Sequence, residues 1–92
     1  MSELVIVVEG VARPMDQIRP ALDERLKEEF PGGMLKWTWD GDVLHLTGPG
    51  AKGTIRLDDG RLVGQALLTP PASMMKPVIE QKVSRAMQRA TS

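Results

Sequence analysis

A chain of 92 residues is long enough for one small hydrophobic core, so we expect a single domain over residues 1–92. Lys and Arg number 12 and Asp and Glu also number 12, so the formal net charge is zero and the composition gives no general attraction to nucleic acid or anionic lipid. The absence of cysteine excludes disulfides, zinc sites with cysteine ligands and thiol catalysis.

The N-terminal segment Glu3–Glu9 is rich in valine and isoleucine, which predicts a first strand. Its apolar residues occupy both alternating positions, a pattern that favours a strand flanked by neighbours or covered on both faces. The apolar run itself, Leu4–Val8, is too short for a signal peptide or a membrane span. We therefore expect a cytoplasmic protein without a membrane-spanning segment.

The next segment has apolar residues at intervals of three and four, which predicts a helix with one buried face over Met15–Phe30. The charged residues from Asp23 to Glu29 are assigned to its solvent side. Pro20 either kinks this helix or marks the first turn of its regular part. Pro31-Gly32-Gly33 ends it.

Both tryptophans and the only histidine follow in residues 35–47, which read as a β-hairpin closed by Asp40-Gly41. In that register Trp39 faces Asp42, Trp37 faces Leu44, and Leu35 faces Leu46. The pleat then separates a dry face from a wet face with Lys36, Thr38, Val43 and His45. Trp37 is expected in the core, whereas Trp39 at the end of the sheet is the more open aromatic residue.

A second hairpin is predicted from residues 51–57 and 62–68 around Asp59-Gly60, with its dry face matching that of the first. A last helix is predicted from Ser73 to about Ala90, and it accepts Pro77 if this residue falls in its first turn. The expected order is β-α-β-β-β-β-α. We predict an α+β two-layer domain in which an antiparallel sheet packs two helices on one face.

No residue combination in this pattern supports catalysis. His45 has no cysteine or second histidine to work with, and it is interpreted as a solvent-facing sheet residue. The aspartates beside the turn glycines are interpreted as turn residues, without the ligand spacing of a calcium loop. Lys52-Gly53-Thr54 departs from the phosphate-loop order, and a strand follows it. We expect no enzyme activity, no catalytic residue, no metal and no cofactor.

The C-terminal helix is the best candidate for a binding surface. It joins methionines to the basic residues Lys82, Arg85 and Arg89, and residues 70–92 contain Glu80 as their single acid. A basic amphipathic helix of this kind lies on an apolar or anionic surface or packs into a partner. The alternative is a core-packing helix with a solvated basic edge. The candidate binding residues are Trp39, Met74, Met75, Val78, Lys82, Arg85 and Arg89, with Ile79 and Met87 as further apolar members.

Several segments together resemble the polyhydroxyalkanoic acid system proteins, also described as polyhydroxyalkanoate granule-region proteins. The matching residues are Leu35–Leu46, Gly50–Ile55, Leu67-Leu68, Pro77–Glu80 and the basic tail, and the helix from Met15 to Phe30 fits the family's charged first helix. The chain departs from the family pattern at Thr69–Met75. The resemblance implies a bacterial protein linked to storage-polymer metabolism, and it carries over no catalytic residue.

Three functions follow as hypotheses. The first is a non-enzymatic accessory protein of polyhydroxyalkanoate metabolism, which binds the granule surface or a granule protein through the C-terminal helix. The second is a small ligand- or protein-binding module with a pocket lined by Trp37, Trp39 and methionines. The third is an RNA-binding domain of α-β-β-β-α order, which the neutral charge and the lack of a basic helix start disfavour, so that no nucleic-acid partner is expected.

Overall fold

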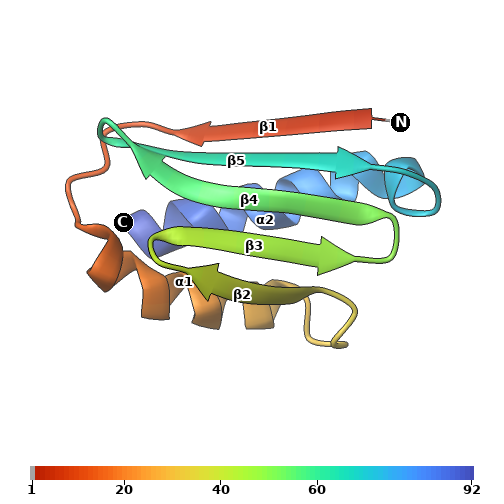
Figure 1. Ribbon diagram of the computed structural model, residues 1–92, viewed down its shortest axis with the longest axis horizontal. Coiled ribbons are helices and arrows are strands. Elements are labelled where there is room, and N and C mark those ends of the chain that lie inside the picture. The colour runs from red at the N-terminus through yellow and green to blue at the C-terminus, as the bar shows by residue number, and fades with distance from the viewer. Residues whose placement is uncertain (1) are drawn as a thin grey trace.

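The computed structural model describes residues 2–92, which form a five-stranded antiparallel sheet covered on one face by two helices (Figure 1). The predicted α+β architecture and the predicted order of elements are confirmed. In chain order the elements are β1 (Ser2–Val8), α1 (Met15–Glu29), β2 (Lys36–Asp40), β3 (Val43–Gly48), β4 (Ala51–Asp58), β5 (Arg61–Leu68), the short 3-10 helix η1 (Ala72–Met75) and α2 (Lys76–Thr91).

The strand order across the sheet is β1-β5-β4-β3-β2, so β1 and β2 are the two edge strands. The expectation that β1 is flanked or covered on both faces is wrong. Leu4 and Ile6 are buried beneath the helices, but Val5 and Val7 are about half exposed. The reason is that β1 pairs only with β5 and that helices cover only one face of the sheet. The α-β-β-β-α order of the RNA-binding hypothesis needs a three-stranded sheet. It is not observed, because the sheet of residues 2–92 has five strands.

The predicted turn of the tryptophan hairpin is wrong by one position. Asp40 pairs with Val43, so Gly41 and Asp42 form the turn, and Trp39 faces Leu44 while Trp37 faces Leu46. Gly41 has a φ of 60°, which suits the first central position of a hairpin turn. The cross-strand partners therefore shift by two residues. A shift of two preserves the alternation of faces, so the predicted dry and wet faces are confirmed.

The second hairpin has the predicted register. Asp58 pairs with Arg61, and Asp59 and Gly60 occupy the turn with φ values of 51° and 74°. In the helices, Pro20 lies inside α1, beyond its first turn, and Pro77 lies in the first turn of α2, the position at which the sequence pattern accepts a proline. The predicted start at Ser73 belongs to η1, and the α-helix begins at Lys76. The fully buried large side chains of the core are Ile18, Leu22, Leu26, Leu44, Ile55, Leu62, Leu68 and Met87.

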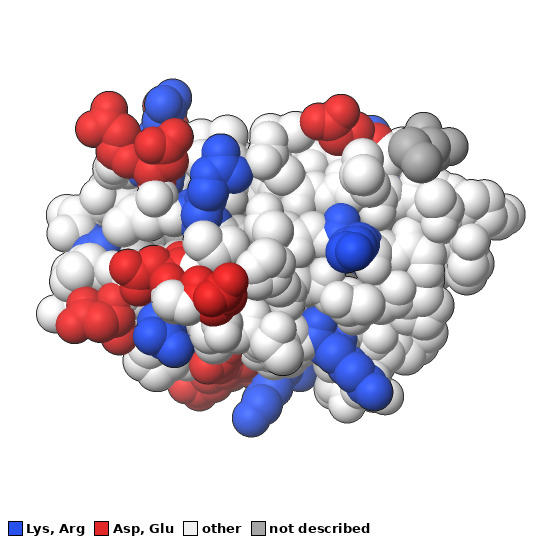
Figure 2. All heavy atoms as spheres, viewed as in Figure 1, with Lys and Arg blue, Asp and Glu red and all other residues white. Residues whose placement is uncertain are grey.

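The two ends of the sheet differ in charge. At one end the backbone N–H of Thr69 donates to the carbonyl of Gly50 at 2.7 Å, and the backbone of Met34 lies beside Gly48. No Asp, Glu, Lys or Arg occurs from Leu62 to Met75. We call this end, formed by Met34, the turn 48–51 and residues 67–78, the apolar end. The opposite end has the acidic hairpin turns and the Glu9–Arg61 ion pair. Charged side chains accordingly gather towards the left of Figure 2 and thin out towards the right.

Candidate functional site

The two tryptophans share one acceptor on α1. The indole N–H groups of Trp37 and Trp39 both donate to Oδ1 of Asp23, at 3.0 and 2.9 Å. The guanidinium of Arg19 lies 4.9 Å from the centroid of the Trp39 ring, within cation–π range. Asp23 therefore joins α1 to β2 and is not simply a solvent-side residue as predicted. Trp37 packs against the core but is only partly buried, and Trp39 is partly buried as well.

A wide, shallow recess of about 550 Å³ lies beside this cluster. It is lined by aromatic faces and by the lysines Lys27 and Lys36, together with Asp23. Partly covered aromatic side chains with nearby cations suit stacking or packing contacts, and this set contains no paired acid and base for catalysis. The predicted pocket combined the tryptophans with methionines, but no methionine lines this recess.

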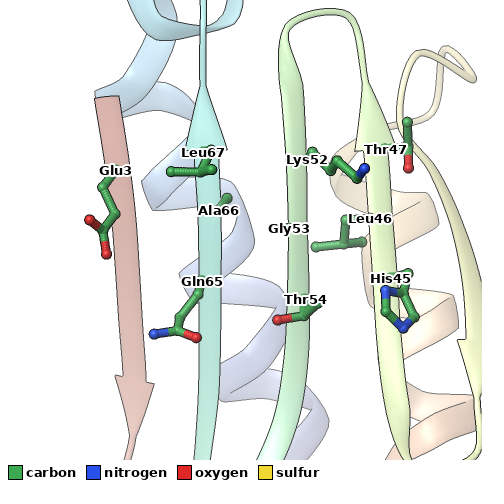
Figure 3. A pocket seen from close by; sticks show the side chains of 10 residues that line it. All are labelled: Glu3, His45, Leu46, Thr47, Lys52, Gly53, Thr54, Gln65, Ala66 and Leu67. Carbon is green, nitrogen blue, oxygen red and sulfur yellow. The ribbon is translucent and has the colours of Figure 1, made fainter. Parts of the chain in front are cut away.

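A second hollow, of about 340 Å³, lies on the sheet face that the helices leave open (Figure 3). His45, Thr54 and Gln65 form one row across β3, β4 and β5 in this hollow, and the neighbouring row includes Lys52 and Glu3. His45 is exposed, as predicted, and it lies opposite Thr38 on β2 and Thr54 on β4; the predicted hairpin register would have placed it opposite Lys36.

This hollow offers polar contacts rather than a reactive pair. Within residues 2–92, no side-chain hydrogen bond or ion pair joins His45 to another group, and no three His, Asp or Glu residues gather in a way that would hold a metal ion. A general base needs a partner within hydrogen-bond reach of the group that it activates. The hollow is therefore a polar contact surface, and no hydrogen-bonded acid–base pair lies in it among residues 2–92.

Two of the basic candidates on α2 are engaged with α1. Lys82 Nζ donates to the carbonyl of Glu29 at 3.0 Å and lies 5.6 Å from the Phe30 ring centroid. The guanidinium of Arg85 lies 3.3 Å from the Glu29 carboxylate, whose side chain is only 12% exposed. A cation near the last turn of a helix also complements the helix dipole. Lys82 and Arg85 thus help α2 to pack on the end of α1, as the core-packing interpretation requires.

The apolar candidates lie together at the apolar end. Met74 and Met75 are 80% and 55% exposed, and Val78 in the first turn of α2 is also exposed. Ile79 is only half-buried, but Met87 is fully buried and cannot contact a partner. Arg89 is exposed near the other end of α2, and Trp39 contacts α1 from the β2 edge. The structure therefore brings together Met74, Met75 and Val78 but not the full predicted set.

Sequence reasoning missed two exposed apolar residues at this end of the sheet. Met34 is 69% exposed, and Leu67 is half exposed on the open face, between Glu3 and Lys52. Met34 follows the glycines after α1, so helical or strand periodicity did not assign it to either face. The absence of charge from Leu62 to Met75 was the available signal for Leu67.

No helix within residues 2–92 is both long enough and apolar enough to cross a membrane. In comparisons by sequence, no curated protein matches the chain. One family model matches residues 12–90, and it is described as putative polyhydroxyalkanoic acid system protein. The match covers α1, β2 to β5, the apolar end and all but the last residue of α2, and it leaves out residues 1–11, which contain β1, and residues 91–92. The chain therefore belongs to the polyhydroxyalkanoic acid system family, which links it to polyhydroxyalkanoate-related processes.

Proposed function

We propose that this protein is a non-enzymatic accessory protein of polyhydroxyalkanoate metabolism, which contacts the storage polymer through its apolar end. The observation that carries the proposal is the run of exposed apolar side chains in η1 and the first turn of α2, where the chain carries no charge from Leu62 to Met75, with further exposed apolar residues at the same end of the sheet. Grouped exposed apolar residues of this kind are typical of contact surfaces. The side chains are Met34, Leu67, Met74, Met75 and Val78.

Methionine suits contact with an irregular apolar surface. Its side chain is unbranched and flexible, so Met34, Met74 and Met75 are able to adapt to a polymer surface that has no fixed shape. The opposite end, with its aspartate-containing turns and the Glu9–Arg61 pair, would stay in water. The molecule is 35 Å long, so this arrangement separates the apolar contact from the charged end along its longest axis.

A sedimentation assay with polyhydroxybutyrate particles tests the contact. We expect the unaltered protein to pellet with the particles. The variant Met34→Ser/Met74→Ser/Met75→Ser should lose at least about tenfold in affinity, since each methionine side chain that the particle half covers contributes on the order of 1 kcal/mol. Val5→Thr/Val7→Thr is the matched control, because it removes exposed apolar groups from the open sheet face. Circular dichroism checks that each variant folds. The proposal is wrong if the unaltered protein stays in the supernatant, or if the methionine variant and the control bind equally.

A charge reversal separates this proposal from binding by the basic edge of α2. Arg85→Glu would also break the contact with Glu29, so Arg89→Glu is the cleaner variant. We expect Arg89→Glu to change particle binding by less than about twofold, because a single exposed charge contributes little to affinity. A large loss of binding in the same sedimentation assay would instead assign the contact to the basic edge.

A further inference from the structure

One edge of the sheet is accessible to a further strand. β2 is an edge strand that pairs only with β3, and α1 runs along it (Figure 1). The backbone N–H and C=O groups of a strand point alternately to its two sides, so half of those on β2 point away from β3. Among residues 2–92, no backbone hydrogen bond from another segment reaches these outward groups. They are therefore available to an added strand.

The recess beside the tryptophans follows this edge. Its strand side is lined by the consecutive residues 35–39, and its helix side by Asp23 and Lys27 of α1. A recess on one face of a sheet is lined by every second residue of a strand, because successive side chains point to opposite faces. Residues of both alternating positions line this recess, so it lies along the edge of β2. Its volume of about 550 Å³ is within the range of about 300–1,000 Å³ that is usual for binding pockets.

The polar atoms of the two indole rings are already engaged. The N–H groups of Trp37 and Trp39 both donate to Oδ1 of Asp23, which fixes the rings before any partner binds. The rings therefore offer apolar surface and no hydrogen bond, so a sugar would find few polar partners between them. An extended peptide would find its polar partners along the β2 backbone instead. Side chains that are already ordered also lower the entropy cost of binding.

The two lysines of the recess lie at the same end of β2. Arg19 contacts the Trp39 ring and Asp23 bonds both indoles, so α1 runs from the end of β2 towards its start. Lys27 lies one helical turn beyond Asp23 and is thus near the start of β2, where Lys36 is its first residue. Both lysines are exposed.

The charge of the recess favours an acidic partner. Neither Lys27 nor Lys36 forms an ion pair within residues 2–92. The carboxylate in the lining belongs to Asp23, whose Oδ1 accepts from both indoles. Two unpaired ammonium groups at one end of an open strand edge complement carboxylates at one end of a bound strand.

We propose that the edge of β2 binds an extended acidic segment of a partner protein as a sixth strand. Alternate apolar side chains of this segment pack against Trp37 and Trp39, and its carboxylates lie beside Lys27 and Lys36. In the antiparallel orientation, which is the commoner one, the acidic residues belong to the C-terminal half of the segment. Main-chain hydrogen bonds supply affinity and the alternate side chains supply specificity. No residue of the apolar end lines this recess, so the proposal does not depend on contact with polymer.

Fluorescence titration with a synthetic peptide tests the proposal. Both tryptophans of the chain line the recess, so their emission reports on this site. The probe is a capped octapeptide in which valine alternates with threonine in the N-terminal half and with glutamate in the C-terminal half. We expect a saturable change in emission with a dissociation constant below about 1 mM. Amide NMR signals of β2 should shift, whereas those of β1, the other edge strand, should not.

Two altered peptides separate strand pairing from other modes of binding. Proline at both central positions removes one N–H from each side of the strand, and it should weaken binding at least about tenfold. Lysine in place of glutamate should weaken binding at least about fivefold, because the carboxylates are lost and like charges meet. If the proline peptide binds as tightly as the probe, the recess accepts side chains without a sixth strand and the proposal is wrong.

Variants of the protein test the charge contact. Lys27→Glu/Lys36→Glu should weaken the glutamate peptide at least about fivefold and bind the lysine peptide more tightly than the unaltered protein does. Lys52→Glu is the matched control, because this exposed lysine lies on β4 and outside the recess. Circular dichroism checks that each variant folds, and Lys36→Glu alone replaces the double variant if that one does not. Absence of a saturable response from the unaltered protein, or equal effects of the double variant and Lys52→Glu, would each overturn the proposal.

The particle assay separates this proposal from the proposed function. Lys27→Glu/Lys36→Glu should pellet with polymer as the unaltered protein does. The triple methionine variant should lose the particles and keep the peptide, because no methionine lines the recess.

Discussion

The substitution Gly50→Ala is expected to lower the free energy of unfolding by about 2–4 kcal/mol, a large share of the stability of a small domain. Gly50 has a φ of 73°, a conformation that costs an L-residue about 1–2 kcal/mol. A Cβ at this position would also overlap the carbonyl oxygen of Thr69 and lie 3.1 Å from that of Pro70. These are backbone atoms, so relief of the overlap would require separation of the β3–β4 turn from the segment that leads to η1.

Chemical denaturation of Gly50→Ala measures this loss, with Gly32→Ala as the matched control. Gly32 has no positive φ, and a Cβ there would meet no atom within 4 Å. Its replacement should therefore be neutral or slightly stabilising, because alanine restricts the unfolded chain. Equal stability of the two variants would show that the junction between Gly50 and Thr69 is looser than described.

The second large effect is expected for Asp23→Leu. The substitution removes the shared acceptor of two partly buried indole N–H groups, at 3.0 and 2.9 Å. A hydrogen bond to a charged group contributes about 1.5–3 kcal/mol when buried, and partial exposure reduces this value. We expect Asp23→Leu to cost about 2–3 kcal/mol in denaturation experiments. The emission of Trp37 and Trp39 should shift to longer wavelength, because the link between β2 and α1 is lost.

Two variants define what Asp23 contributes. Asp23→Asn keeps an oxygen that accepts from an indole N–H, so it should recover about half of the stability that Asp23→Leu loses. Glu24→Leu replaces the neighbouring exposed acid on the same helix and should change stability by less than about 0.5 kcal/mol. If Asp23→Leu and Glu24→Leu behave alike, the shared acceptor does not stabilise the contact between α1 and β2.

Alternation along the strands was sufficient to predict the faces of the sheet, even where the turn was wrong. Trp37 and Leu46 share a face in both the predicted and the observed registers, because the error amounts to two residues. The edge position of β1 was not predictable from alternation. Its apolar residues at both parities are as compatible with a central strand as with an edge strand whose Val5 and Val7 remain half exposed.

The candidate site was harder to predict, because charge and periodicity describe one element at a time. Helical spacing correctly grouped Lys82 and Arg85, but it did not show that Glu29 at the end of α1 would engage both. Similarly, Asp23 is one of several acids on α1, and only the position of β2 brings two indole groups to it. Met34 lies at the same end of the sheet as η1 because its backbone is beside Gly48, while Gly50 in the same turn is beside Thr69 and Ala72, a relation between distant segments.

The pairing of β1 with β5 also constrains how the chain folds. Ser2 pairs with Leu68, and Arg13 donates to the carbonyl of Ala90, so the first strand and the segment after it depend on the last third of the chain. The meander from β2 to β5 is built from local hairpins that form early, whereas the β1–β5 pair must wait for the loop between them to close. During synthesis the apolar strand β1 therefore leaves the ribosome long before its partner and remains unpaired until β5 is available.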